Sequence, residues 1–123
     1  SHGRPDAYTY WGKIVEFRMQ NAKKAFTWYK KAADAGDAEG AFYVAKAYCE
    51  GSVDKTKSNS IDCYKWLNIA KANAKEPLLS VVQDAIKTVE EQISPEEKAA
   101  ALKQAKAVTP AQETKKKRSF KLF

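Results

Sequence analysis

Apolar side chains recur along this chain at steps of three and four residues, which is the spacing of helices with one buried face. The pattern is clearest at Leu78, Val82, Ile86 and Val89. Alternation of polar and apolar residues, the pattern of a half-buried strand, occurs only at residues 119–123, a stretch too short to stand alone. The pattern therefore predicts an all-α fold.

Cap and turn residues divide this pattern into helices. Pro5 suits the first turn of a helix, because backbone N–H groups in that turn have no partner within the helix and proline has no N–H to leave unpaired. Asn21 and Asp37 are good N-caps for a second and a third helix. Gly36 and Gly51 are expected to end those two helices, since glycine adopts the left-handed conformation found after a C-terminus.

Three further helices are expected in the second half of the chain. Ser58 or Asn59 is expected to start the fourth helix, and Pro77 lies in the first turn of the fifth. Ser94 and Glu97 have the spacing of a capping box, in which each side chain accepts a hydrogen bond from the other residue's backbone amide. They predict the start of a sixth helix.

The chain also repeats itself. Residues 25–33 return after 38 positions as residues 63–71, with a small residue, a tryptophan and an apolar residue in register. Residues 7–15 return after 33 positions as residues 40–48. Repetition at such periods predicts stacked units that bury each other's apolar faces, and it favours a surface for partners over a catalytic pocket.

Small residues mark the expected helix crossings. Gly12 and Ala45 stand where the first helix of each pair lets the second come close, and Ala25 and Cys63 are their counterparts on the second helix. Larger side chains there would overfill the contact, at a cost of about 1 to 3 kcal/mol per site. Other side chains that we expect to be buried are Ala7, Trp11, Ile14 and Val15 in the first helix, and Trp28 and Trp66 between the pairs.

At these residues the chain resembles the Sel-one-like repeat, a subfamily of the tetratricopeptide-like helical hairpins. The family's repeat reads approximately A-x-x-W-Y-x-K-A-A-x-x-G-x-A-x-A-x-x-x-L-G-x-x-Y-x-x-G. The matching residues here are Ala25, Trp28, Tyr29, Lys31, Ala32, Ala33, Gly36, Ala38, Tyr48 and Gly51.

The resemblance implies an α-α superhelix, or solenoid, in one domain over residues 5–108. Its hairpins would span about residues 6–35 and 37–73, and a closing helix pair about residues 76–107. Residues 1–4 resemble a cloning remnant, and residues 109–123 form a basic C-terminal tail.

The family's geometry implies that the first helix of each pair lines a concave groove for a protein or peptide partner. The groove residues would be Thr9, Tyr10, Lys13, Glu16, Phe17, Glu39, Phe42, Tyr43, Lys46 and Glu50. Tyr10-x-x-Lys13 recurs as Tyr43-x-x-Lys46, two aromatic and basic pairs suited to an extended peptide with acidic groups. The alternative is that the tyrosines cover neighbouring helices and the lysines are merely solvated.

The formal net charge of +7 is largely a property of the tail, which leaves the rest of the chain near +3. Elsewhere basic and acidic residues are interspersed, so we do not expect nucleic acid binding. The alternative function is binding of an anionic ligand through the tail, to a membrane surface, a cell-wall polymer or nucleic acid. The contact residues would be Lys115, Lys116, Lys117, Arg118, Phe120, Lys121 and Phe123.

The sequence offers little for catalysis or for metal binding. His2 is the only histidine, and no glycine-rich phosphate loop is present, so we expect neither an enzyme nor a cofactor. Zinc is not expected with two cysteines and one histidine. Cys49 and Cys63 could form a disulfide, but the position of Cys63 at a small packing site favours two reduced thiols.

These patterns predict a protein interaction adaptor rather than a catalyst. The family resemblance implies a bacterial origin. It also slightly favours a periplasmic or secreted location over a cytoplasmic one, while partner identity and oligomeric state stay open.

Overall fold

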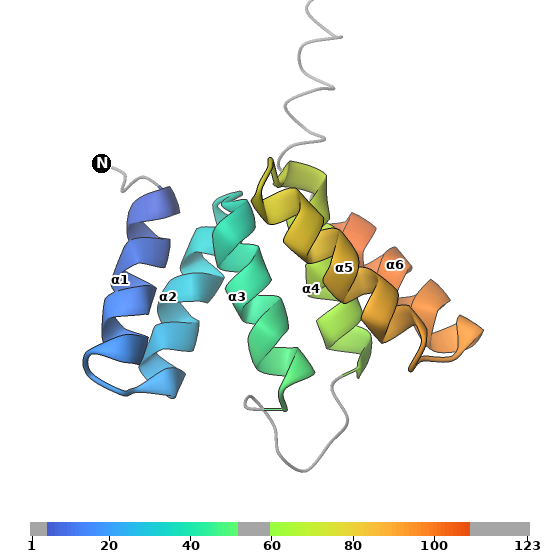
Figure 1. Cartoon of the computed structure of the whole chain (residues 1–123), viewed down its shortest axis with the longest axis horizontal. Helices are drawn as coiled ribbons and strands as arrows, with labels where there is room; N and C mark the ends of the chain where they lie inside the picture. Colours follow the sequence, from blue (N-terminus) through green and yellow to red (C-terminus); the bar gives the residue numbers. More distant parts are fainter. Residues whose placement is uncertain (1–4, 52–59, 109–123) are drawn as a thin grey trace, which may run out of the picture.

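The chain folds into helices throughout the described residues, which are 5–51 and 60–108 of the computed structural model (Figure 1). The helices are α1 (Pro5–Phe17), α2 (Ala22–Asp34), α3 (Ala38–Cys49), α4 (Ser60–Asn73), α5 (Leu78–Glu90) and α6 (Pro95–Val108). The described part contains no strand, which confirms the all-α prediction. None of these six helices combines the length and the hydropathy that crossing a bilayer requires.

The predicted caps of α2 and α3 are confirmed. The side chains of Asn21 and Asp37 accept hydrogen bonds from the backbone amide three residues further on, at 3.0 and 2.8 Å. Gly36 and Gly51 follow α2 and α3 with φ angles of 99° and 74°, a region that side chains with a Cβ rarely adopt. Both α2 and α3 therefore start and stop for local reasons.

In the second half of the chain one predicted cap is confirmed and one differs. The Ser94 amide donates to the Glu97 carboxylate at 3.0 Å, and the Glu97 amide donates to the Ser94 hydroxyl at 3.1 Å, which confirms the capping box. Pro77 is the N-cap of α5 rather than a residue of its first turn, and its side chain makes no capping hydrogen bond. Ser58 and Asn59 lie outside the described residues.

The first four helices pack as two pairs placed side by side, α1 with α2 and α3 with α4 (Figure 1). The pairs meet mainly through α2 and α3, and α1 touches α3 less extensively. In each pair the two helices run in opposite directions. This arrangement places the core along α3 and α4.

The last two helices pack on α4 more than on each other, unlike the closing helix pair that the family resemblance implied. Both α5 and α6 pack on α4, whereas contacts between α5 and α6 are sparse. The reason lies in α4 itself, which buries apolar side chains around much of its circumference, and a helix that is apolar on several sides needs several neighbours. Its buried residues are Cys63, Tyr64, Trp66, Leu67, Ile69 and Ala70.

Small residues sit at the crossings as predicted. A Cβ added to Gly12 would lie 2.5 Å from Cε1 of Tyr29, and one added to Gly40 would lie 2.6 Å from Cβ of Ala32. Real Cβ atoms essentially never approach that closely, so a larger residue would displace the Tyr29 ring at Gly12 and the facing helix at Gly40. Ala45 is fully buried at its own crossing.

Two of the three tryptophans pack as expected and one does not. Trp66 is buried, and Trp28 is half-buried against the core. Trp11 is 51% exposed, so its prediction as a core residue was wrong. It stands at the repeat position of buried Val44, but α1 lies at the end of the row of helices and is covered mainly by α2.

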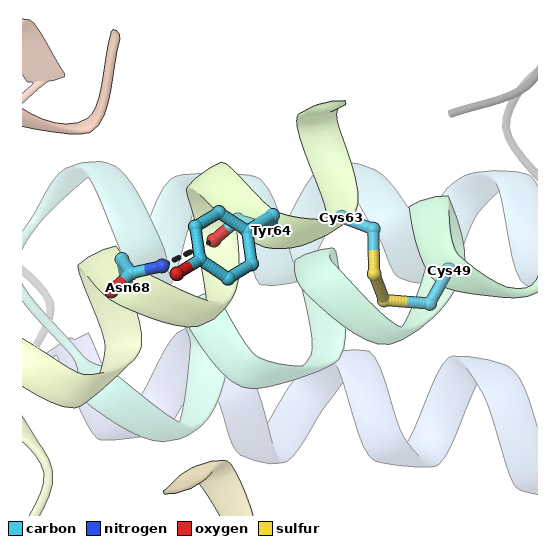
Figure 2. Close-up of a disulfide and its surroundings, with 4 residues drawn as sticks. All are labelled: Cys49, Cys63, Tyr64 and Asn68. Carbon is cyan, nitrogen blue, oxygen red and sulfur yellow. Dashed lines mark hydrogen bonds between the residues drawn. A yellow bond between two sulfur atoms is a disulfide. The ribbon is translucent and has the colours of Figure 1, made fainter. Parts of the chain in front are cut away.

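Cys49 and Cys63 form a disulfide, so the expectation of two reduced thiols was wrong (Figure 2). Because α3 and α4 run in opposite directions, the end of α3 lies beside the start of α4, and the two Cα atoms are 4.7 Å apart. Cys63 is buried as predicted, while Cys49 is exposed. One turn beyond the disulfide on α4, the Asn68 side chain donates to the Tyr64 carbonyl at 2.9 Å (Figure 2).

Candidate functional site

A small surface depression lies where the C-terminal part of α1 meets α2 and α3. Its volume is about 40 Å³, which leaves room for one small side chain rather than for a cofactor. We call it the tyrosine depression. It is lined by Glu16, Ala22, Phe26, Tyr29, Tyr43, Lys46, Ala47 and Glu50.

Four residues that the sequence assigned to the groove line this depression: Glu16, Tyr43, Lys46 and Glu50. The other four lining residues were missed. Three of them, Ala22, Phe26 and Tyr29, belong to α2, the second helix of its pair, whereas the family's geometry drew groove residues only from first helices. Nothing in the local sequence indicates which α2 side chains reach the gap between α1 and α3.

Two stacked tyrosines form the floor of the depression. The rings of Tyr29 and Tyr43 lie 4.6 Å apart between centroids at an interplanar angle of 14°. The Tyr29 hydroxyl donates to Oε1 of Glu16 at 2.6 Å. Burial, and then this hydrogen bond to a carboxylate, raise the pKa of Tyr29 above its ordinary value, so the phenol stays protonated and the stack stays fixed.

A lysine from α1 lies on Tyr43 as well. The Nζ atom of Lys13 is 5.6 Å from the centroid of the Tyr43 ring, within the range of a cation–π interaction. The same atom is 2.7 Å from Oε2 of Glu39. The hydrogen bond to Glu39 raises the pKa of Lys13, against the opposing effect of burial. The structure thus brings together three predicted groove residues, Lys13, Glu39 and Tyr43.

Thr9 does not belong to an open groove, which corrects the prediction. It is 1% exposed, and its hydroxyl donates to Oδ2 of Asp37 at 2.5 Å. The same carboxylate oxygen caps α3 by accepting from the Gly40 amide. Thr9 therefore ties the middle of α1 to the start of α3. The sequence could not show this, because the two partners are 28 residues apart.

The remaining predicted groove residues lie outside the depression. Phe42 is half-buried against the core, and its ring meets that of Tyr43 edge-on at 5.8 Å. Tyr10 and Phe17 are 62% and 63% exposed. The Tyr10 ring touches that of its neighbour Trp11. The two Tyr-x-x-Lys pairs are therefore not equivalent, since only Tyr43 is held between other side chains.

A second hollow, which the sequence did not indicate, lies between the C-terminal part of α4 and α5. Its volume is about 370 Å³, and most of its lining is polar. At its edge Glu90 accepts hydrogen bonds from the Tyr64 hydroxyl at 2.6 Å and from Nζ of Lys98 at 3.0 Å, and both bonds lower the pKa of Glu90. The lining residues are Lys71, Ser80, Gln83, Asp84, Ile86, Lys87 and Glu90.

Within residues 5–51 and 60–108, no three histidine, cysteine, aspartate or glutamate side chains gather as a metal site would require. His2 and the predicted tail contacts lie outside the described residues; the latter are Lys115, Lys116, Lys117, Arg118, Phe120, Lys121 and Phe123. Comparison of the chain with protein-family models, with curated proteins and with solved structures finds no match.

Proposed function

We propose that this chain is a protein interaction module of the Sel-one-like class that binds an extended peptide segment of a protein partner across the tyrosine depression. The observation that carries the proposal is the setting of Tyr43. Its ring stacks on Tyr29, its edge meets Phe42, and the Lys13 ammonium lies over it. An aromatic surface fixed in this way loses little conformational freedom on binding.

The arrangement of the first four helices supports the repeat class. In both pairs the first helix carries a small residue at the same repeat position. Gly12 meets Tyr29 within the first pair, and buried Ala45 occupies the corresponding position in the second. Stacked hairpins of this kind present long surfaces suited to peptides.

The chemistry of the depression favours an apolar side chain flanked by an acidic one. Tyr43, Phe26 and Ala47 offer apolar surface, while exposed Lys46 offers a cation at the rim. Glu16 and Glu50 lie on the same rim and would repel an acidic group placed on their side. We therefore expect the acidic residue of the peptide next to Lys46 and the apolar residue over the tyrosine stack.

The disulfide favours an oxidising compartment for this function, because such bonds persist mainly outside the cytosol. An adaptor in the periplasm or outside the cell fits this chemistry.

The proposal is tested by selecting peptides from a displayed random library against the full chain and titrating the selected peptides by calorimetry. Lys46→Glu reverses an exposed rim charge and is expected to weaken binding by at least about tenfold. Lys87→Glu makes the same change of charge on α5, away from the depression, and is expected to leave the affinity within about twofold. Tyr43→Phe keeps the stack and is expected to retain binding.

Two results would contradict the proposal. One is a set of selected peptides whose affinity is indifferent to Lys46→Glu and to Tyr43→Ala, in variants whose circular dichroism matches the parent chain. The other is binding that disappears at moderate salt and on removal of residues 109–123, which would assign recognition to the basic tail instead.

A further inference from the structure

Large exposed apolar side chains are concentrated at one end of the molecule. Five are present among the described residues, and three of them, Tyr10, Trp11 and Phe17, belong to α1. A fourth, Met19, lies in the turn that follows α1, and only Val81 lies elsewhere. Isolated exposed apolar residues are ordinary, but a cluster on one helix marks an interaction surface.

These side chains form one face of α1. At 100° per residue, Ala7, Tyr10, Ile14 and Phe17 fall within an arc of about 80°, and Trp11 borders it. We call these five residues the α1 outer face. The side of α1 that packs on α2 and α3 carries Thr9, Gly12 and Glu16 and points roughly 150° away. Figure 1 shows α1 at the end of the row of helices.

The 33-residue sequence repeat shows what the corresponding face of α3 contacts within the molecule. With the 33-residue offset, Ala7 and Tyr10 correspond to Gly40 and Tyr43 of α3. Both α3 residues contact the α1–α2 pair: Gly40 touches Ala32, and Tyr43 stacks on a tyrosine of α2. The α1 outer face is thus the surface of its helix on which another helix would pack.

The order of residues along the face is self-complementary. If a second α1 lies antiparallel across it with the two-fold axis at residue 12, small Ala7 faces large Phe17, and Tyr10 faces Ile14. The same alignment sets the negative Asp6 against the positive Arg18 of the other copy, twice. A parallel alignment would instead pair like charges and align the two helix dipoles.

The exposed area sets the strength of such a contact. Three aromatic side chains of roughly 150–250 Å² each, exposed by half to two thirds, offer about 350 Å² per copy and about 700 Å² for two copies. Stable complexes bury about 1,200–2,000 Å² in total. The exposed face therefore suits a reversible dimer that depends on protein concentration.

From these observations we propose that the α1 outer face is a self-association surface, and that its occupant is the α1 outer face of a second copy of this chain, packed antiparallel with the two-fold axis level with residue 12. This inference is independent of the peptide-binding proposal, because the tyrosine depression lies on the side of Glu16 and Tyr29. The dimer leaves that depression open on each copy.

Sedimentation of the full chain from micromolar to millimolar concentration tests the proposal. The mass is expected to rise from that of one chain to that of two. Tyr10→Glu and Phe17→Glu are expected to weaken the dimer by at least about tenfold, because each places a charge in the apolar contact. Val81→Glu, at the matched exposed apolar residue on α5, is expected to leave the dissociation constant within about twofold.

The antiparallel alignment has its own test. Arg18→Asp is expected to weaken the dimer, and the exchange Asp6→Arg with Arg18→Asp is expected to restore it, with circular dichroism showing that the helix content is kept. A mass of one chain at every concentration would overturn the proposal. A dimer that Tyr10→Glu leaves intact would also overturn it. So would a dimer that Val81→Glu weakens as much as Tyr10→Glu does.

Discussion

Gly40 is the most sensitive test of the packing described above. Replacing glycine with alanine inside a helix ordinarily stabilises a protein by about 1 kcal/mol, because alanine restricts the unfolded chain more. At Gly40 the new methyl group would lie 2.6 Å from Cβ of Ala32, 3.0 Å from the Thr9 hydroxyl oxygen and 3.1 Å from the backbone nitrogen of Ala33. Two of these three atoms are fixed to the backbone of α2, so no side-chain rotation relieves the contact.

The balance of the two effects predicts net destabilisation. Overfilling of a packed contact costs about 1 to 3 kcal/mol, and the fixed neighbours place Gly40→Ala at the upper end. After the gain of about 1 kcal/mol in helix propensity, we expect the free energy of unfolding to fall by about 2 kcal/mol. For a domain of this size that lowers the melting temperature by roughly 10 °C. Urea unfolding followed by far-ultraviolet circular dichroism, with the disulfide intact, measures the change.

A double-mutant cycle with Ala32→Gly isolates the contact. Alone, Ala32→Gly is expected to cost about 2 kcal/mol from lost helix propensity and one lost buried methyl group. Combined with Gly40→Ala it removes the atom at 2.6 Å, so the double variant is expected to be more stable than additivity predicts by about 1 to 2 kcal/mol. A neutral or stabilising Gly40→Ala, or strict additivity, would refute this account of the helix crossing.

Three further changes should be measurable in the same unfolding assay. Ser94→Ala removes one half of a capping box and is expected to cost about 1 kcal/mol; no change would show that α6 adds little to stability. Replacing Cys49 and Cys63 together with alanine opens a loop with a sequence separation of 14 and is expected to cost about 3 kcal/mol, whereas unchanged stability under reducing conditions would count against the bridge. Above pH 10 the chain should lose stability, because the raised pKa of Tyr29 means that the unfolded state releases the phenol proton first. Tyr29→Phe should reduce this loss of stability at alkaline pH. If the variant loses as much stability as the parent chain, the loss arises from other titrating groups.

The candidate site was predicted only in part. Glu16, Tyr43, Lys46 and Glu50, four of the residues that the family's geometry implied for a groove, line one depression. Thr9 is buried instead, because a hydroxyl in the middle of α1 meets the carboxylate that caps α3. A helical period shows which residues share a face of one helix, but not which other helix covers that face.

The sequence alone determined where α2 and α3 begin and end and where α6 begins, because caps act within three or four residues. Asn21, Asp37 and the pair Ser94 and Glu97 each satisfy amides that the chain places beside them. The small residues at the crossings were also evident, since a repeated pattern reveals a repeated steric need.

Only the tertiary structure decided which surfaces are covered. It joined Cys49 to Cys63, packed both α5 and α6 on α4 with few contacts between them, and left Trp11 exposed although its repeat counterpart Val44 is buried. Local sequence encodes the apolar character of a face. Burial, however, depends on whether a neighbour is present, and that is a property of the whole packed chain.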